Sequence, residues 1–594
     1  MSNSLGEILS DRTESLDTVL IEKYYISNEV NSTIIDRLLD SEQYIFEGSR
    51  GIGKTMIMKK AEIYADKNFG RDSILTVLVS FEESLRLEKI KIVYENECDP
   101  FLQWTMGKIL FEILKKLNVL KPDFIESLST NLQSLFNNNG QSDLFDLCTY
   151  YNSILQDYIR LLETGDVDNN KTLAEIAPSS NLTKILNNPT SFKSFVTSLI
   201  NKLSIKRIVL LFDEAAHVFS LSQQEKFFTF FKSLRSPLIS CNAAVYPGIT
   251  NYGTSFEKGQ DAKELKINWE FTNSSDISFI KKVLKKRIQL FDISYWNKLT
   301  INNEIIELIC LCSNGNPRHA FHLIDSLDIR KAFAKKTITY QMAINNIRET
   351  FESKWHQLET LKARLNIYSN EIELAEIFIK ETVIPNLLDW NTKRRKVNSK
   401  LSSGFYIETI AYDQLSILFS VLVYLNIITT NLSKKSIGHN KFGYYVSVNP
   451  SLLFSDYILK NVKDVDNISV SIENNQGYYL TSKPIMDMIE KLENTVEFKC
   501  LNNTCSYTSN IKFNFCPTCG AEYKLAEQKS LYEILRSHSI NNLPLSKAIL
   551  RRVGQKFSNI GEIIDANNNE LRMDYIQDVR IKKIKSAAIE YMAG

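Results

Sequence analysis

The sequence lacks both a strong charge imbalance and a long apolar run. Its 594 residues contain 71 Lys and Arg against 69 Asp and Glu, a formal net charge of +2. No global field therefore attracts nucleic acid, and any such binding must come from local patches. The longest apolar run, residues 415–428, includes Ser416, Ser420 and Asn426 and is too short and mixed to span a bilayer. The N-terminus lacks the basic and apolar regions of a secretion signal, so we expect a cytoplasmic protein with no membrane contact.

The sequence also lacks a Ser/His/Asp or Cys/His nucleophile pattern and a histidine metal site. None of the six histidines has metal-ligand spacing (His217, His319, His322, His356, His439, His538). Five of the nine cysteines are scattered, which in a reducing compartment indicates unpaired core thiols (Cys98, Cys148, Cys241, Cys310, Cys312). The candidate chemistry of the chain lies instead in two other motifs.

The first motif is a glycine-rich loop. Residues 48–55 read GSRGIGKT and follow an apolar segment, residues 44–46, that predicts a strand, while the residues after Thr55 predict a helix. In such a P-loop, backbone N–H groups surround the phosphates, Lys54 reaches the outer phosphates, and Thr55 offers its hydroxyl to Mg²⁺. The predicted nucleotide contacts are Gly48, Ser49, Arg50, Gly51, Ile52, Gly53, Lys54 and Thr55. A glycine-rich turn that binds nothing is the alternative, because short patterns also match by chance.

The second motif supplies carboxylates. Residues 208–214 read IVLLFDE, an apolar run that ends in Asp213 and Glu214, typical of a buried parallel strand with acids at its carboxyl end. Asp213 is predicted to hold Mg²⁺ and Glu214 to polarise the attacking water. An exposed acidic pair that starts a helix, with Asp213 as its cap, is the alternative. Together the motifs predict an Mg²⁺-dependent ATPase with Lys54 and Glu214 as catalytic residues.

Alternating strand and helix patterns predict an α/β domain with a parallel sheet. Residues 73–81 and 238–246 indicate two further buried strands. The predicted domains are an α/β domain at 1–270 with a helical insertion at about 85–200, a helical lid at 271–350, and smaller domains at 351–490, 491–528 and 529–594.

Four motifs in this order resemble a known family. GSRGIGKT, LLFDEAAH, a strand that ends in AVYPG, and the helix start GNPR resemble an AAA+ ATPase, closest to the origin-recognition and replication-licensing branch and its bacterial relatives. The resemblance covers about residues 17–327. It implies a P-loop AAA+ parallel sheet with a helical lid, and it gives Arg318 the role of the lid arginine that senses the terminal phosphate. Asn316 and Pro317 suit the start of that helix.

Two positions depart from the family's pattern. A polar sensor residue is expected at the end of the strand at 238–246, where Asn242 and Tyr246 are the candidates. The stretch between Arg235 and Arg287 contains no arginine, although AAA+ subunits usually lend a finger arginine from this stretch to a neighbour's ATP. Arg235 or Lys258 is the candidate substitute, and the resemblance leaves a homo-oligomer open.

The same branch typically places a winged helix after the lid, and residues 415–448 fit one. An apolar helix is followed by a short strand at 427–430, the polar turn NLSKKSIGHN, and an alternating strand at 442–448. Four residues are placed on the wing (Lys434, Lys435, His439, Lys441). The run KRRK at 393–396, with Lys400 beyond it, is either a phosphate contact or a solvated basic loop.

The remaining four cysteines have the spacing of a zinc ribbon. Cys500 and Cys505 form a Cx4C turn, and Cys516 and Cys519 lie in a CPTCG turn. Four thiolates from two turns suit structural Zn²⁺ in tetrahedral coordination, with no open position for chemistry. A redox disulfide pair is the alternative. The zinc module is predicted to form a docking surface for DNA or protein.

Residues 543–594 predict short helices and resemble a helix-hairpin-helix domain, whose loop normally uses two glycines to bring backbone N–H groups to a phosphate. Asp578, Val579 and Arg580 stand where the glycines of the second hairpin belong, whereas the first hairpin keeps Gly554. The positive charge in this segment comes from Arg551, Arg552, Arg580, Lys582, Lys583 and Lys585. A protein-docking helical bundle is the alternative.

These features lead to two functional hypotheses. In the first, the chain is an AAA+ ATPase that couples ATP binding and hydrolysis to engagement of DNA through the winged-helix, zinc-ribbon and helix-hairpin-helix-like modules. In the second, it is an ATP-gated switch or adaptor of a bacterial anti-phage defence or mobile-element system that recruits a partner effector protein. The missing finger arginine, the long insertion and the altered hairpin motivate the second hypothesis.

Overall fold

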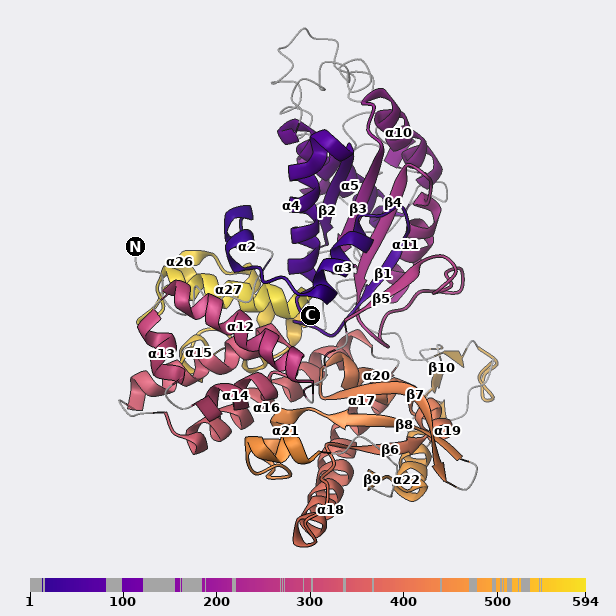
Figure 1. The fold of residues 1–594 in the computed structure, drawn as a ribbon. Helices are drawn as coiled ribbons and strands as arrows, with labels where there is room; N and C mark the ends of the chain where they lie inside the picture. The colour runs from indigo at the N-terminus through magenta and orange to yellow at the C-terminus, as the bar shows by residue number, and fades with distance from the viewer. Residues whose placement is uncertain are drawn as a thin grey trace. The chain divides into compact units, whose positions relative to one another are not determined.

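Figure 1 shows the fold of the chain in a computed structural model. It describes residues 13, 16–81, 99–120, 155–160, 162, 184–186, 188–215, 221–267, 269, 271, 273–291, 293–300, 303–334, 338–365, 368–438, 441–468, 478–493, 498–500, 502, 505, 507–509, 515–521, 523–524, 535–543, 545 and 547–593. The chain divides into two units, a first of residues 10–268 and a second of residues 269–591.

The described part of the first unit contains a five-stranded parallel sheet. Its strands are β1 (Tyr44–Glu47), β2 (Ile74–Ser80), β3 (Arg207–Asp213), β4 (Ile239–Val245) and β5 (Lys263–Lys266). They lie in the order β2-β3-β4-β1-β5. The predicted parallel sheet is therefore confirmed. Because all strands run the same way, the residues after β1, β3 and β4 meet at one edge of the sheet.

Helices pack around this sheet in two groups (Figure 1). The first group is α2 (Thr18–Tyr24), α3 (Glu29–Leu38) and α4 (Lys54–Asp72), and the second is α5 (Pro100–Leu120), α10 (Pro189–Lys202) and α11 (Leu221–Leu234). Helix α4 contacts both α2 and α3, whereas α11 contacts α5 and α10. Aromatic rings fill the core beside β3, where Phe212 meets Phe227 edge-on at 5.3 Å and stacks on Phe81 at 5.8 Å. This packing fixes the end of β3, where the acids lie.

The second unit begins with a bundle of helices. These are α12 (Ser274–Phe291), α13 (Ile293–Thr300), α14 (Asn303–Cys312), α15 (Pro317–Ala334) and α16 (Tyr340–Arg364). The turn before α15 uses Gly315 at a φ of +71°, and the Asn316 side chain accepts a hydrogen bond from the backbone N–H of His319 at 3.1 Å. Asn316 therefore caps α15, as its position in the sequence suggests.

A second sheet follows, with strand order β7-β8-β6-β9. Its strands are β6 (Gly404–Glu408), β7 (Ile428–Gly438), β8 (Lys441–Val448) and β9 (Tyr478–Tyr479). The helical segments around it are α17 (Ser369–Ile377), the π-helix η4 (Phe378–Val383), α18 (Ile384–Lys396), α19 (Thr409–Gln414), α20 (Ser416–Tyr424), α21 (Pro450–Ser455), the 3₁₀ helix η5 (Val462–Asn467) and α22 (Ser482–Glu493).

Two sequence predictions in this region are wrong in detail. The segment predicted as a polar turn is mostly strand, because β7 continues to Gly438 and pairs with β8 through Lys435 and Ser436. Both arms of the hairpin are largely exposed there, so no apolar alternation marks the strand. The run KRRK at 393–396 is the last turn of α18 and not a loop.

The remaining described residues form small elements. A three-stranded sheet consists of β10 (Phe498–Cys500), β11 (Thr508–Ser509) and β12 (Tyr523–Lys524). The C-terminal helices are η7 (Ile540–Asn542), α24 (Lys547–Val553), α25 (Ile560–Asp565), α26 (Asn568–Leu571) and α27 (Asp578–Ala593). Among the helices that the structure describes, none is long and apolar enough to cross a membrane.

Candidate functional site

The glycine loop lies between β1 and α4. Backbone N–H of Gly48 approaches the carbonyl of Val245 at 3.4 Å, so the loop starts beside the end of β4. Gly51 and Gly53 have φ values of +81° and +98°, which side chains other than glycine rarely adopt. Gly53 is also the N-cap of α4. The glycines thus let the chain turn directly into a helix N-terminus, where backbone N–H groups attract anions.

Lys54 lies inside this loop. Its side chain is buried, and Nζ donates hydrogen bonds to the carbonyls of Gly48 at 2.6 Å and Ser49 at 3.2 Å. These neutral carbonyls are weaker partners for an ammonium group than a phosphate oxygen. A phosphate oxygen in the loop would therefore replace these carbonyls as the hydrogen-bond partner of Lys54. Thr55, the next residue, is partly exposed in the first turn of α4.

The acids lie at the end of β3. Asp213 is buried and is the last residue of the strand. Its Oδ1 accepts a hydrogen bond from the backbone N–H of Glu214 at 3.1 Å. Glu214 has a φ of +59°, an uncommon conformation for a residue with a side chain and one that often marks functional sites. This turn directs the Glu214 carboxylate toward the end of β4.

Tyr246 joins the two motifs. It follows β4 directly, and its hydroxyl donates to the Glu214 carboxylate, 3.2 Å from each oxygen. The Lys54 Nζ lies 3.9 Å from the centroid of the same ring, a distance at which a cation is attracted to an aromatic face. One side chain therefore contacts both the lysine of the loop and the second acid of β3.

Asn242, the other predicted sensor residue, has a structural role. It is buried within β4, where Oδ1 accepts from the backbone N–H of Tyr44 at 3.0 Å and Nδ2 donates to the carbonyl of Leu38 at 2.8 Å. These bonds use its amide to join β4 to β1 and α3. Of the two sensor candidates, Tyr246 is the one that contacts Glu214.

The two candidate substitutes for a finger residue differ in their surroundings. Lys258 forms an ion pair with Glu47 at 3.3 Å and lies over the Tyr252 ring, 5.0 Å from its centroid. Arg235 is 54% exposed, with its nearest described carboxylate, that of Glu42, 3.9 Å away. Lys258 is thus held within its own subunit, at the end of β1.

Arg318 lies in the second unit, in the first turn of α15. Next to it, His319 is buried, with Nε2 3.4 Å from the hydroxyl oxygen of Ser451. Desolvation lowers the pKa of His319 well below its usual value, and the positive charge of Lys354 lowers it further. His319 is therefore a neutral packing residue. The phosphate-sensing role of Arg318 stays a prediction.

Strand order and motif positions together decide the fold. The glycine loop follows β1, the acids end β3, and β4 lies between these strands in the order β2-β3-β4-β1-β5. The first unit therefore has a parallel α/β fold that places the glycine loop and the acids at the same edge of the sheet.

No protein family and no curated protein matches the sequence. The solved structures to which the chain is similar include the following three. Domain III of the Thermotoga maritima replication initiation protein DnaA is 12% identical, with 56% of this chain and 95% of that chain covered and a TM-score of 0.26. The Aeropyrum pernix ORC1 protein, in complex with DNA, is 10% identical over 74% and 94%, with a TM-score of 0.29. The A. pernix ORC2 protein (ADPNP–ADP complexes) is 11% identical over 76% and 97%, with a TM-score of 0.31. The fold assignment rests on the strand order and the motifs.

The four cysteines of the predicted ribbon lie close together, with Cys500 as the last residue of β10. Their sulfur atoms are all within 4.8 Å of one another. The Cys500 and Cys519 sulfurs are 3.4 Å apart, and those of Cys505 and Cys516 are 3.8 Å apart. Four thiolates at about 2.3 Å from a central Zn²⁺ would lie roughly 3.8 Å from one another. Gly520, at a φ of +72°, forms the turn directly after Cys519. The cluster therefore fits tetrahedral zinc.

The other described cysteines are buried and free. Desolvation raises the pKa of each of the thiols Cys241, Cys310 and Cys312, and for Cys310 the pKa rises to about 12. Such thiols are unreactive core residues. Cys98, Cys148, His217 and His439 lie outside the described residues.

The predicted basic contacts near the second sheet are of two kinds. Arg395 is tied into the fold by an ion pair with Asp464 at 2.7 Å, and Lys441 forms one with Glu408 at 2.7 Å. Lys434 and Lys435 are exposed on β7. Lys393, Lys396, Lys400 and Lys441 are exposed as well, so solvent access alone does not single out Lys434 and Lys435.

The C-terminal helices contain a cation–aromatic stack. Arg552 and Arg580 both lie over the ring of Tyr575, at 4.3 Å and 3.6 Å from its centroid. Lys585 donates to two backbone carbonyls at the end of α25, so its charge caps a helix. Asp578 begins α27, and the residues that replace the expected glycines thus lie in a helical turn.

Proposed function

We propose that the chain binds ATP with Mg²⁺ between the glycine loop and the acids of β3, and hydrolyses it. The observation that supports this most is the contact of Tyr246 with both Lys54 and Glu214, because it brings the two motifs to one place. Lys54 would exchange the loop carbonyls for the outer phosphates, while Thr55 and Asp213 would hold the magnesium. Mg²⁺ supplies the charge neutralisation that phosphoryl transfer needs.

Glu214 is the residue proposed to orient the attacking water and accept its proton. Its carboxylate accepts from the Tyr246 hydroxyl, which fixes its position at the edge of the sheet. Phosphoryl transfer depends on an oriented nucleophile more than on covalent chemistry, so a positioned carboxylate is the requirement. Arg318 of the lid is proposed to contact the terminal phosphate.

We further propose that ATP turnover is coupled to engagement of DNA. The second unit carries the candidate contacts, above all the hairpin of β7 and β8, where Lys434 and Lys435 are exposed and Phe442 is 55% exposed. Exposed lysines bind phosphates without sequence preference. The zinc cluster is proposed to hold β10, β11 and β12 together as a docking surface.

The test is ATP turnover with and without duplex DNA. Wild-type protein is expected to release phosphate faster when DNA is added, and Glu214→Gln is expected to bind ATP without turnover. Lys67→Ala, a change on the exposed side of the same α4 that carries Lys54, is the matched control and should behave as wild type. Turnover that is indifferent to single-stranded, duplex and forked DNA would contradict the coupling, and ATP binding without any turnover would contradict hydrolysis.

One observation favours the adaptor hypothesis as a second candidate. Lys258, a candidate substitute for the missing finger arginine, is ion-paired with Glu47 of its own subunit. If no residue completes a neighbour's site, hydrolysis in a ring is slow and the ATP-bound state persists to recruit a partner. Native mass measurement with ATP tests this. A stoichiometric partner that is lost in Lys54→Ala would support the adaptor role, and a nucleotide-independent monomer would contradict it.

A further inference from the structure

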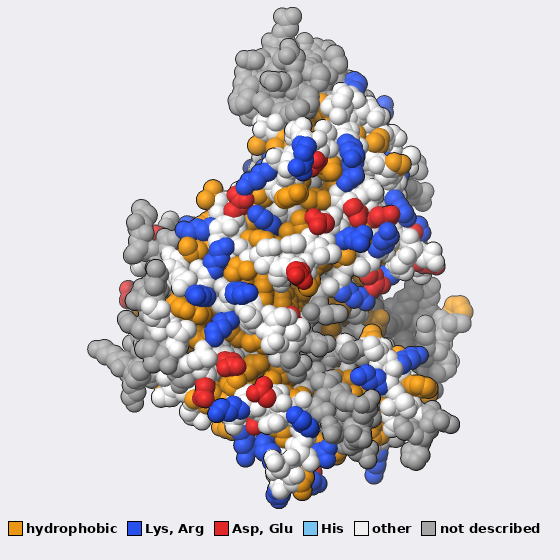
Figure 2. All heavy atoms as spheres, viewed as in Figure 1, with side chains coloured by type: hydrophobic (Ala, Val, Ile, Leu, Met, Phe, Trp, Pro, Cys, Tyr) orange, Lys and Arg blue, Asp and Glu red, His pale blue; other side chains and the backbone are white. Residues whose placement is uncertain are grey.

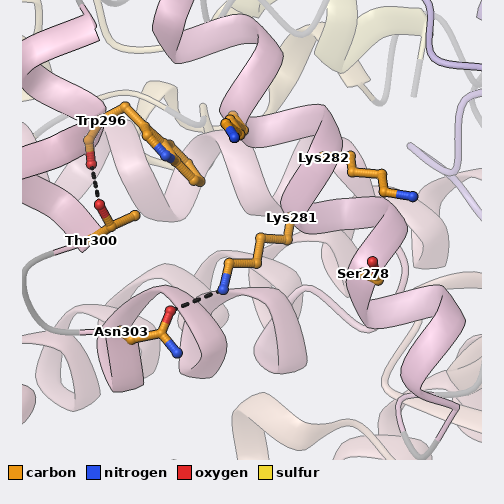
Figure 3. Close-up of a pocket in the computed structure, with 7 residues that line it drawn as sticks. Ser278, Lys281, Lys282, Trp296, Thr300 and Asn303 are labelled. Carbon is orange, nitrogen blue, oxygen red and sulfur yellow. Dashed lines mark hydrogen bonds between the residues drawn. The ribbon is translucent and has the colours of Figure 1, made fainter.

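The helical bundle of the second unit contains an open pocket that no part of the proposed mechanism uses. It has a volume of about 380 Å³ and lies between α12, α13 and α14 (Figure 3). Seven residues line it: Ser278, Lys281, Lys282, Lys285, Trp296, Thr300 and Asn303. Three of the seven are lysines and none is acidic.

The lysines come from one face of α12. Ser278, Lys281, Lys282 and Lys285 have the spacing i, i+3, i+4 and i+7, which places them along a single side of a helix. On the opposite side of α12, apolar residues such as Leu284 are buried. Helix α12 thus presents three ammonium groups to the pocket while its apolar side fixes its position.

None of these three lysines forms an ion pair with a described residue. Lys281 Nζ donates to the Asn303 side-chain oxygen at 2.9 Å, a neutral partner that holds the ammonium group over the pocket (Figure 3). Lys282 and Lys285 are exposed. On the surface shown in Figure 2, blue basic and red acidic side chains are interspersed. The pocket, with three lysines and no carboxylate in its lining, is therefore locally positive although the charges of the whole chain nearly balance.

The shape of the pocket distinguishes among anions. The positive charges of the pocket are spread along one helix and do not converge on a single point. The helix rises about 1.5 Å per residue, so the step from Lys281 to Lys285 covers roughly 6 Å along the axis. Phosphates of one DNA strand follow one another every 3.4 Å along the duplex axis. The spread of charge therefore fits a backbone with successive phosphates.

The aromatic residue of the pocket limits what can be recognised. Trp296 is only 6% exposed, so its ring forms a wall and offers no free face for stacking of a base. Thr300 and Asn303 add neutral groups beside the lysines: the Thr300 hydroxyl donates to the carbonyl of Trp296 at 3.0 Å, and the Asn303 oxygen accepts from Lys281. Contacts of this kind position a nucleic-acid backbone and carry no sequence information.

We propose that this pocket binds the phosphate backbone of a nucleic acid without sequence preference, through Lys281, Lys282 and Lys285. The inference rests on the proposed function, because it assigns a contact surface for the DNA that ATP turnover is coupled to. It differs from that function in naming a site on α12, outside the hairpin, the zinc cluster and the C-terminal helices.

The experiment measures the Kd of a fluorescent DNA duplex against NaCl concentration. The test variant replaces Lys281, Lys282 and Lys285 by Ala in the full chain. The matched control removes the same charge from exposed lysines elsewhere in the second unit, with Lys460, Lys463 and Lys483 replaced by Ala. A third variant replaces the three pocket lysines by Arg, which keeps the charge. Thermal unfolding compares the folded state of all variants.

Each phosphate contact contributes about 0.9 to the slope of log K against log salt. The Lys→Ala pocket variant is therefore expected to bind more weakly and to lose about 2 to 3 from the slope, equally for unrelated duplex sequences. The Lys→Arg variant and the control should keep the wild-type slope.

Several outcomes would overturn the inference. If the pocket variant matches the control while the wild-type protein binds DNA, the pocket is not a contact and the proposed function stands. If the wild-type protein binds no form of DNA, both the pocket and the proposed coupling of ATP turnover to DNA fail. Displacement of the duplex by millimolar inorganic phosphate at constant ionic strength would identify a free-anion site instead. Polyglutamate binding of equal strength that is lost in the pocket variant would identify an acidic protein as the occupant.

Discussion

The hydroxyl of Tyr246 lies 3.2 Å from both carboxylate oxygens of Glu214. This contact joins the ends of two neighbouring strands, β4 and β3. Lys54 lies over the face of the same tyrosine ring. The residue that would reach the phosphates and the residue that would orient water thus contact the same side chain.

This contact predicts the effect of Tyr246→Phe. The change keeps the ring beneath Lys54 but removes the hydroxyl that positions Glu214, so kcat should fall about 10-fold while the affinity for ATP stays within twofold. Steady-state kinetics and a titration with a fluorescent ATP analogue measure the two quantities.

Tyr44→Phe is the control for this change. Its hydroxyl donates to Asp40 at 2.6 Å and not to Asp213 or Glu214, so the variant should keep wild-type turnover. Wild-type or higher kcat in Tyr246→Phe would remove the positioning role.

A second prediction concerns metal content. Because the four sulfurs have the spacing of a tetrahedral site, the purified protein should contain about one zinc per chain by elemental analysis. Cys516→Ser should lose most of this zinc, because three remaining thiolates bind more weakly. Cys241→Ala removes a buried free thiol and should keep it. A zinc-free wild-type protein with two disulfides in this segment would refute the ribbon.

A third prediction concerns pH. Lys354 is buried, and its Nζ donates to the carbonyl of Leu425 at 2.8 Å. Desolvation lowers its pKa from 10.5 to about 8. Between these values the unfolded chain binds this proton and the folded chain does not, so stability rises with pH over the window from about 8 to 10.5. Below pH 8 the lysine is charged in both states, and its burial destabilises the fold by a constant amount.

Lys354→Met tests this relationship. The variant has no titrating group at this position. The increase of roughly 3 kcal/mol in the free energy of unfolding between pH 8 and 10.5, at about 1.4 kcal/mol per pKa unit, should therefore be absent from it. Urea unfolding followed at several pH values measures it. A variant with the same pH dependence as the wild-type protein would show that Lys354 keeps its usual pKa.

Part of the fold and of the candidate site could be predicted from the sequence because the signals are local. The glycine loop and the strand that ends in Asp213 and Glu214 are contiguous motifs, and their alternation with helices predicts the parallel sheet. Asn316 at the start of α15 is likewise a local cap signal.

The rest depends on contacts that a linear pattern does not contain. Tyr246 and Glu214 are 32 residues apart, and nothing in the sequence separates Tyr246 from Asn242 as the residue that reaches the acids. The start of β7 is predicted as a strand, but residues 432–436 are exposed and lack apolar alternation, so the sequence predicts a turn there. The α12 pocket had a usable signal, since Ser278, Lys281, Lys282 and Lys285 follow a helical period, but only the fold shows that α13 and α14 complete it.

The most direct test of the central claim is calorimetric titration of ATP and Mg²⁺ into the wild-type protein and Lys54→Ala. One binding event per chain is expected in the wild-type protein and none in Lys54→Ala, because the variant lacks the ammonium group proposed to contact the phosphates while the loop glycines remain. Lys67→Ala should titrate as wild type. No heat beyond dilution in the wild-type protein, or equal binding in Lys54→Ala, would contradict a nucleotide site at this loop.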